Sequence, residues 1–133
     1  IDNNKDYNFI ALENLNNLQV QELFNKAKLY IDFGNHPGKD RMPREAVMAN
    51  CCIITGLRGS ASNEVDIPIL AKYKLNDSEL IDNNLFRSLV NNIFTDFEVN
   101  LNNFNSYKKS IECEKKIFQE QTKRIFTTIL HEK

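Results

Sequence analysis

The sequence predicts an α/β fold: a small, parallel, Rossmann-like sheet of three to four strands, flanked by helices and followed by long C-terminal helices. Short apolar runs alternate with helical patterns between residues 8 and 75, and such alternation favours parallel strands joined by crossovers. After Pro68 the chain contains neither Gly nor Pro, and its apolar residues recur at helical spacing. The second half is therefore expected to be all helical.

The predicted elements follow from the pattern of each segment. Apolar, β-branched or aromatic runs predict strands, and the two central runs each end at a glycine, Gly34 and Gly56. Asn16 or Asn17 is expected to cap the first helix, and Asp77 or Ser78 the third. The predicted strands are 8–12, 28–33, 51–55 and a short edge strand at 71–75, and the predicted helices are 15–27, 43–49, 79–99 and 104–131.

The last helix carries an apolar stripe that is expected to pack on the sheet or in a helical bundle. Its spacing is not a clean heptad over enough repeats to indicate a coiled coil. The stripe comprises Tyr107, Ile111, Phe118, Ile125 and Ile129.

Length, charge and cysteine content limit the class of protein. The 133 residues and net charge of −1 predict one α/β domain over 1–133, with a strand-containing part at 8–75 and a helical part at 76–133. Nothing in the charge indicates nucleic acid, no run approaches a transmembrane segment, and no leader opens the sequence, so a cytoplasmic location is expected. Cys51 and Cys52 are interpreted as small buried strand residues, and no metal-ligand spacing occurs.

The loop at 34–42 is unusually polar for a connection between two buried strands. Ligands of parallel sheets bind beyond the carboxyl ends of the strands, and the loops at 34–42 and 56–66 both follow strands. We therefore expect the two loops to converge at one edge. The charged or polar side chains of the first loop and the helix after it are His36, Lys39, Asp40, Arg41, Arg44 and Glu45.

The chemistry of these groups favours a nucleotide. Lys39 and Arg41 supply cations, and Gly34 and Gly38 allow close approach of a ligand to the backbone. A helix beginning at Pro43 offers a seat for phosphate at its N-terminus. Glu45, expected in its first turn, suits a vicinal diol such as a ribose. Across the edge, a loop of small residues offers backbone N–H groups, from Gly59, Ser60 and Ala61.

The string HPGKDRMPREA resembles a bacterial subgroup of glycosyltransferase-like proteins. The order of elements resembles the C-terminal half-domain of GT-B-type glycosyltransferases. In this order, PREA is followed by a short helix, a buried strand, a Gly-containing loop and an acidic residue (Glu64 or Asp66). Those enzymes have two Rossmann-like domains, and the similarity is to the retaining family that includes glycogen synthase. It covers about residues 8–75 and implies a partial GT-B C-terminal domain that binds a nucleotide-sugar donor.

The resemblance assigns roles to individual residues. Glu45 matches the Glu that binds the ribose, and the loop before the helix, which contacts sugar and phosphates, holds His36, Gly38, Lys39, Asp40 and Arg41. Gly59, Ser60 and Ala61 match the backbone contacts to the nucleotide. It also implies metal-independent transfer without a cofactor, in bacterial surface polysaccharide synthesis at the inner face of the membrane.

Two departures from the family pattern favour binding over turnover. Pro37 stands where the family often has a second Glu, and the family's upstream cations and N-terminal acceptor-binding domain have no counterpart here. The chain is therefore expected to be an inactive fragment that needs that domain or a partner chain, and no catalytic residue is identified.

Each assignment has a structural alternative. In these alternatives, Glu45 serves only as a helix N-terminal carboxylate, and Arg41 pairs with Asp40 or Glu45. Arg44 then braces the loop or a partner domain. His36 bonds to backbone, and Ser60 is a loop residue rather than a nucleophile. The whole chain is then a non-catalytic α/β interaction module, or a regulator that binds a sugar nucleotide without transferring the sugar.

Overall fold

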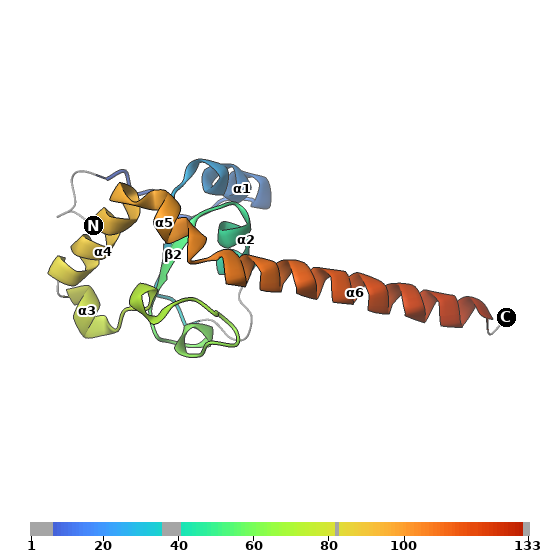
Figure 1. Ribbon diagram of the computed structural model, residues 1–133. Coiled ribbons are helices and arrows are strands. Elements are labelled where there is room, and N and C mark those ends of the chain that lie inside the picture. The colour runs from blue at the N-terminus through green and yellow to red at the C-terminus, as the bar shows by residue number, and fades with distance from the viewer. Residues whose placement is uncertain (1–6, 36–40, 82, 132–133) are drawn as a thin grey trace.

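Two parallel strands form the centre of the fold in the computed structural model, which describes residues 7–35, 41–81 and 83–131 (Figure 1). Strand β1 (Leu29–Asp32) pairs with strand β2 (Cys52–Thr55) in a register that runs from Leu29 opposite Cys52 to Asp32 opposite Thr55. Helix α2 (Arg41–Met48) lies between them in the chain and packs against both strands. The predicted mixed α/β class and the parallel pairing are therefore confirmed.

The sheet is smaller than predicted, because two of the four expected strands are not formed. Residues 8–12 have no strand partner; the chain there is held by Tyr7, whose ring lies 4.8 Å from that of Phe94. Residues 71–75 instead begin with a 3-10 helix, η2 (Ala71–Tyr73), followed by a single parallel bridge between Thr55 and Lys74. Within the described residues the sheet therefore has two strands.

Helix α1 (Asn17–Lys26) forms where its capping residues and apolar spacing predict it. The Asn16 side chain accepts the N–H of Gln19 at 2.9 Å, and the Gln19 side chain accepts the N–H of Asn16 at 2.9 Å. This reciprocal pair satisfies two backbone donors that a helix start otherwise leaves open. Val20 and Phe24, one turn apart, are the buried residues of this helix.

The predicted single helix at 79–99 is wrong, because the chain turns after Thr95. It forms α3 (Asp77–Ile81), α4 (Asn83–Thr95) and α5 (Phe97–Asn102), and Asn76 rather than Asp77 or Ser78 accepts the N–H of Glu79. The break after α4 is stabilised by the buried Asn100, whose Nδ2 donates to the backbone oxygens of Asn92 and Asp96. The side-chain amide thus adds a second donor to two carbonyls that also accept the backbone N–H groups of Asp96 and Asn100.

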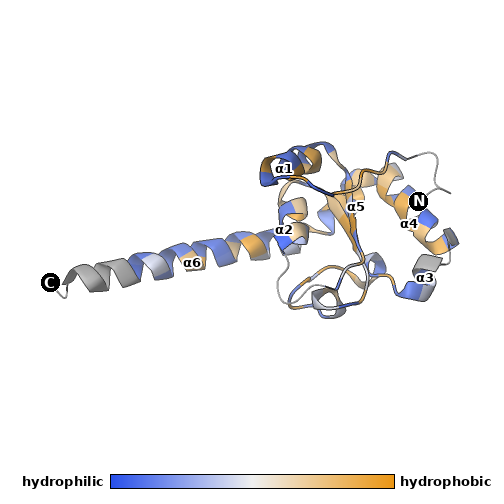
Figure 2. Cartoon of the chain, turned by 180° about the vertical axis from the view of Figure 1, so that it is seen from behind, coloured by the Kyte–Doolittle hydropathy of each residue, from blue (hydrophilic) through white to orange (hydrophobic). Residues whose placement is uncertain are grey.

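Helix α6 (Asn105–His131) confirms the predicted last helix, but it projects away from the rest of the chain (Figure 1). The expected packing of its whole apolar stripe is wrong, because Phe118 is 70% exposed. Its first turns pack on α2, and Tyr107 in these turns is buried, as is Phe104 just before the helix. The colouring in Figure 2 shows hydrophobic residues concentrated in the sheet and in α4, whereas α6 is mainly hydrophilic.

One hydrophobic cluster joins the strand-containing part to the helical part. Cys51 and Cys52 belong to it with no exposed surface, as predicted, and burial raises the pKa of their thiols to about 11 and about 12. The fully buried side chains with the largest volume are Tyr73, Tyr107, Phe104, Ile53, Ile54, Ile93, Val47 and Val90. In both Figure 1 and Figure 2, α1 lies at one end of this core, and the loop after β2 lies at the other.

Candidate functional site

The two loops that sequence reasoning singled out leave the same edge of the sheet. The N–H of Gly56, just after β2, donates to the backbone oxygen of Asp32 at the end of β1, at 3.1 Å. A Cβ atom on Gly56 would lie 3.1 Å from Cδ1 of Phe33, so the segments that follow β1 and β2 diverge from a point of close contact. Parallel pairing thus places both loops where open α/β sheets bind ligands.

Asp32 brings a carboxylate to this edge that sequence reasoning did not select. It is half-buried; one oxygen accepts the hydroxyl of Tyr30 at 2.6 Å and the other accepts the N–H of Gly34 at 2.8 Å. These bonds orient the carboxylate and tie the first residues of the loop to the strand. The available signal was an acidic residue at the end of an apolar run, two residues before a glycine.

Helix α2 begins earlier than predicted, which changes the place of Glu45. The first helical residue is Arg41, so Pro43 does lie in the first turn but Glu45 lies in the second. The Nε of Arg41 donates to Oε1 of Glu45 at 2.6 Å, and both side chains are partly exposed. The pairing of Arg41 with Glu45, which the sequence left open, is therefore present, and it places a cation and a carboxylate side by side on one face of α2.

Arg44 braces the fold through α6, rather than the loop or the partner domain that its alternative interpretation named. Its Nη2 donates to Oε2 of Glu114 at 2.7 Å, which links α2 to α6 across 70 residues of sequence. The side chain is only 23% exposed. Within α2, Arg44 thus binds a residue of α6, whereas Arg41 and Glu45 bind each other.

Four of the predicted site residues lie outside the described residues. These are His36, Gly38, Lys39 and Asp40, all within the gap between residues 35 and 41. Their predicted roles remain predictions.

The loop after β2 is a tight turn rather than an open cradle. Gly59 has a positive φ of 56°, and it precedes the 3-10 helix η1 (Ser60–Ser62). The N–H groups of Ala61 and Ser62 donate to the backbone oxygens of Arg58 and Gly59 at 3.1 Å, so the turn itself uses them. Ser60 and Ala61 are 3% and 5% exposed, whereas Gly59 is exposed. Of this group, Gly59 is therefore the residue open to a ligand.

Asn63 and Lys74 hold the far end of this loop. The Asn63 side chain accepts the N–H of Val65 at 2.9 Å and that of Asp66 at 2.8 Å, which makes Asp66 part of a turn. Nζ of Lys74 donates to the backbone oxygen of Asn63 at 2.9 Å. Burial lowers the pKa of Lys74, and the Glu64 carboxylate offsets this effect only in part.

Lys74 is the second residue that sequence reasoning missed at this edge. It is bridged to Thr55, the last residue of β2, and the N–H of Leu75 donates to the Thr55 oxygen at 2.9 Å. A lysine in a predicted edge strand carries no signal by itself. The tertiary fold brings it beside the loop after β2.

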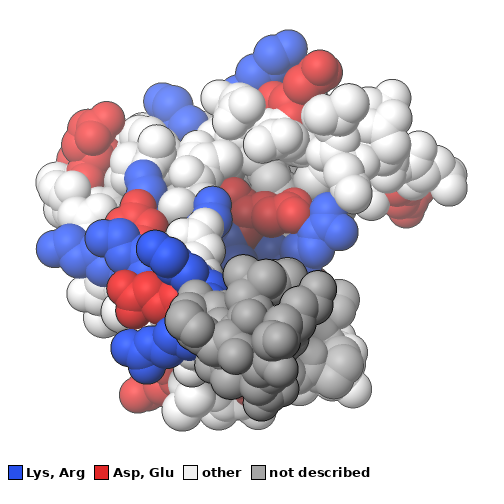
Figure 3. Space-filling model, turned by 90° about the vertical axis from the view of Figure 1, so that its right-hand side faces the viewer, with Lys and Arg blue, Asp and Glu red and all other residues white. Residues whose placement is uncertain are grey.

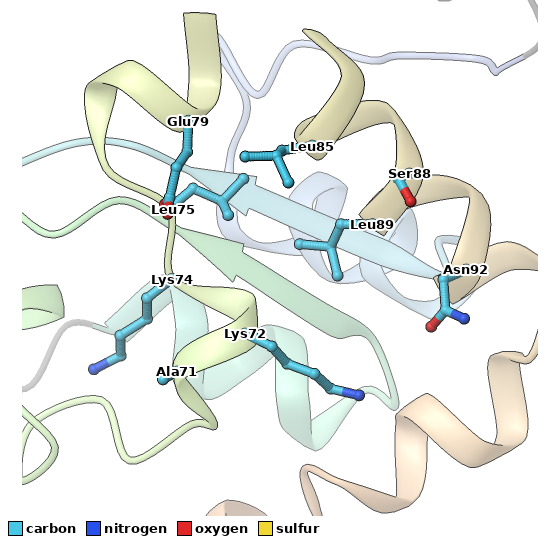
Figure 4. A pocket seen from close by; sticks show the side chains of 9 residues that line it. All are labelled: Ala71, Lys72, Lys74, Leu75, Glu79, Leu85, Ser88, Leu89 and Asn92. Carbon is cyan, nitrogen blue, oxygen red and sulfur yellow. The ribbon is translucent and has the colours of Figure 1, made fainter. Parts of the chain in front are cut away.

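A hollow of about 410 Å³ lies next to this edge, between η2 and helices α3 and α4 (Figure 4). In Figure 4 the side chains of Leu75, Leu85 and Leu89 converge, and those of Lys72 and Lys74 point away from them. The hollow is open and partly apolar, and none of the predicted site residues lines it. It is therefore separate from the face formed by Arg41 and Glu45.

Two further properties concern metals and membranes. Across the described ranges, no three His, Cys, Asp or Glu side chains are grouped in a way that suits a metal ion. None of the helices in these ranges combines the length and the apolar character that a membrane-spanning segment needs.

Comparison of the chain with protein-family models, with curated proteins and with solved structures finds no match in any of the three. The geometry described above therefore carries the functional argument.

Proposed function

We propose that this chain is the nucleotide-sugar-binding portion of a GT-B-type glycosyltransferase that acts in bacterial surface polysaccharide synthesis. One observation carries the proposal: β1 and β2 are parallel, and the loops after Asp32 and Thr55 leave the same edge, next to the start of α2. This is the position at which open α/β sheets bind nucleotides. The resemblance of HPGKDRMPREA to glycosyltransferase-like proteins supports the same assignment.

The proposed donor site uses the charges of α2. The N-terminus of α2 carries a partial positive charge, and the guanidinium of Arg41 adds a full one at its first residue. Both would face the diphosphate of the donor and stabilise it as the leaving group when the glycosidic bond breaks. Glu45, held 2.6 Å from Arg41, would accept hydrogen bonds from the ribose hydroxyls. No metal ion is required for this chemistry.

The proposal extends to a larger domain and to a location. A Rossmann-like sheet of three to four strands would include a third strand position next to β2, and the parallel bridge between Thr55 and Lys74 supports it. The acceptor would bind to an N-terminal domain or a partner chain, so that the fragment binds the donor but does not turn it over. The proposed location is the cytoplasm, at the inner face of the membrane.

The ion pairs favour a second candidate, a non-catalytic interaction module. Arg41, Arg44 and Glu45 all have protein partners, and a purely structural loop would show the same pairs. A regulator that binds a sugar nucleotide without transferring the sugar would share the donor site, and only a transfer assay on a chain with its acceptor domain distinguishes it from an enzyme.

Calorimetric titration with UDP, GDP, ADP and dTDP, and with their glucose conjugates, tests the proposal. We expect one base to bind, and Glu45→Ala to weaken that binding by about tenfold or more, because it removes charge-assisted hydrogen bonds to the ribose. The exposed ion pair with Arg41 stabilises the fold by only about 0.5 kcal/mol, so the melting temperature should change by about 2 °C or less.

Glu22→Ala is the matched control, because Glu22 is an exposed carboxylate on α1, outside the proposed donor site. Its affinity should equal that of the wild type. The absence of binding by every nucleotide would refute the donor site and leave the interaction module. Equal losses for Glu45→Ala and Glu22→Ala would show that a ligand binds elsewhere.

A further inference from the structure

Helix α6 reaches far beyond the part of it that packs on the fold. Its 27 residues span about 40 Å, and Figure 1 shows most of that length projecting away from the other elements. Its contacts with the rest of the fold lie in the first turns: Tyr107 is buried, Lys108 donates to the Asn50 side chain, and Glu114 accepts from Arg44. From residue 115 to residue 124, every side chain is exposed except the half-buried Thr122.

The projecting part exposes large apolar side chains. Ile117 is 48% exposed and Phe118 is 70% exposed. Phe118 follows Ile111 by seven residues, nearly two helical turns, so the two lie above one another on one face of the helix. Tertiary packing supplies most of the stability of protein helices, so an exposed phenylalanine on a long projecting helix calls for a surface that covers it.

The charge of α6 has the opposite sign to that of the remaining chain. The helix contains six Lys and Arg against three Glu, whereas the other residues contain eleven Lys and Arg against fifteen Asp and Glu. One of the three glutamates, Glu114, is paired with Arg44 from α2. Figure 3 views the end of the molecule from which α6 projects and shows Lys and Arg side chains gathered on the left, with Asp and Glu among them.

One row of lysines on α6 lies beside its apolar face. Lys108 and Lys115 are seven residues apart, and Lys115 is a helical neighbour of both Ile111 and Phe118, at four and three residues. Lys109, Lys116 and Lys123 follow the same seven-residue spacing on the side of the helix turned away from Phe118. Two glutamates, Glu112 and Glu120, interrupt this basic side.

The combination of exposed apolar side chains and lysines on α6 favours one kind of binding partner. A second copy of α6 would bring two helices of the same net charge together, which opposes pairing. A nucleic acid would use the lysines but would leave Phe118 and Ile117 without an apolar partner. An anionic lipid surface suits both groups, since the apolar side chains enter the acyl boundary while lysine stems extend their ammonium groups to the headgroups.

We propose that α6 is an interfacial helix, which lies on the surface of an anionic lipid bilayer with Phe118 and Ile117 inserted and with Lys115, beside Phe118, against the headgroups. It lies on the bilayer and does not cross it. This inference does not depend on nucleotide binding, because it uses a part of α6 remote from the sheet edge (Figure 1).

Co-sedimentation of the 133-residue chain with vesicles tests the inference. We expect binding to vesicles of phosphatidylcholine mixed with phosphatidylglycerol, weak or no binding to phosphatidylcholine alone, and a loss of binding at high salt. Phe118→Ser should reduce partitioning by about tenfold, through the loss of buried apolar area. Lys115→Gln should reduce it by about fivefold, from about 1 kcal/mol for a lysine near the surface.

Leu18→Ser is the matched control for Phe118→Ser, because Leu18 on α1 is 71% exposed. Lys26→Gln, also on α1, is the control for Lys115→Gln. Both controls should bind as the wild type does, and circular dichroism should show unchanged helix content in all variants. Failure to bind anionic vesicles would overturn the proposal, as would equal losses in variants and controls. A wild-type dimer in light scattering that Phe118→Ser converts to a monomer would assign the face to a second copy instead.

Discussion

Replacing Tyr73 by phenylalanine is expected to destabilise the fold by about 2 kcal/mol, although it removes a single oxygen atom. Tyr73 has no exposed surface; its hydroxyl donates to Oδ1 of Asn100 at 2.7 Å and accepts from Nδ2 of Asn103 at 2.9 Å. Asn100 is itself only 1% exposed. The variant therefore leaves a buried amide oxygen without this donor, and leaving a buried polar group unsatisfied costs about 1–3 kcal/mol.

This contact also positions the edge of the sheet. Tyr73 ends η2 and immediately precedes Lys74, which is bridged to the end of β2. Asn100 connects the other side of the contact to the turn between α4 and α5, because its Nδ2 donates to Asn92 and Asp96. Loss of the hydroxyl bond should therefore loosen the placement of Lys74 as well as lower the free energy of unfolding.

The measurement is urea unfolding followed by circular dichroism, with a thermal scan in parallel. A loss of about 2 kcal/mol corresponds to a fall in melting temperature of about 7 °C for a chain of this length. Asn100→Ala should be at least as destabilising, and the double variant should show a coupling energy of about 1 kcal/mol, because both single changes break the same bond.

Tyr7→Phe provides the control, since it is the same chemical change at a tyrosine whose hydroxyl bonds to the exposed Asn91. It should cost about 0.5 kcal/mol or less. If Tyr73→Phe unfolds at the same urea concentration as Tyr7→Phe, or if Tyr73 and Asn100 show no coupling, the reasoning from buried hydrogen bonds is refuted.

Two further predictions concern the thiols and the contact between α2 and α6. At about pH 8 iodoacetamide should alkylate the exposed Cys113 in the folded chain, while Cys51 and Cys52 react only after unfolding, because burial holds their pKa near 11 and 12. For the same reason the free energy of unfolding should fall as the pH rises from the ordinary thiol pKa of 9.0 toward these values, since the unfolded thiols ionise first. Rapid labelling of all three thiols would contradict the first expectation. A free energy of unfolding that stays constant over this alkaline range in denaturant titrations would contradict the second. Arg44→Ala should lower the free energy of unfolding by about 1 kcal/mol or less and speed amide exchange around Glu114, because it removes the partly buried ion pair to α6. Unchanged amide exchange around Glu114 would show that the ion pair does not hold the helix.

Local sequence signals predicted those elements whose stability is largely local. Helix α1 forms at its expected place, because Asn16 and Gln19 cap it and Val20 and Phe24 recur at helical spacing. The apolar runs that end before Gly34 and Gly56 became β1 and β2. Each of these signals lies within a few residues of the structure it specifies, so no distant contact was needed to read it.

The errors arose where distant partners decide the structure. The run at 8–12 has strand composition but lies outside the sheet, where Tyr7 stacks on Phe94. The run at 71–75 forms a 3-10 helix, in which the Tyr73 hydroxyl reaches Asn100 and Asn103. Apolar periodicity across 79–99 gave no sign of the turn after α4, because Asn100 stabilises that turn from the following helix.

The candidate site shows the same division. The two polar loops and the start of a helix near Pro43 were predicted from composition and from the parallel order of the elements. The pairings of Arg41 with Glu45 and of Arg44 with Glu114 remained open among alternatives. Asp32 and Lys74 were missed, because one closes an ordinary strand and the other approaches the edge only through its bridge to Thr55.

By itself the sequence determined the α/β class, the parallel pair of strands and the long last helix, because apolar periodicity and glycine positions act over short distances. Only the tertiary structure decided how many strands the sheet has and which partners its charged side chains bind. Those properties depend on side chains such as Asn100 and Glu114, which lie 27 and 70 residues from the groups they contact, Tyr73 and Arg44.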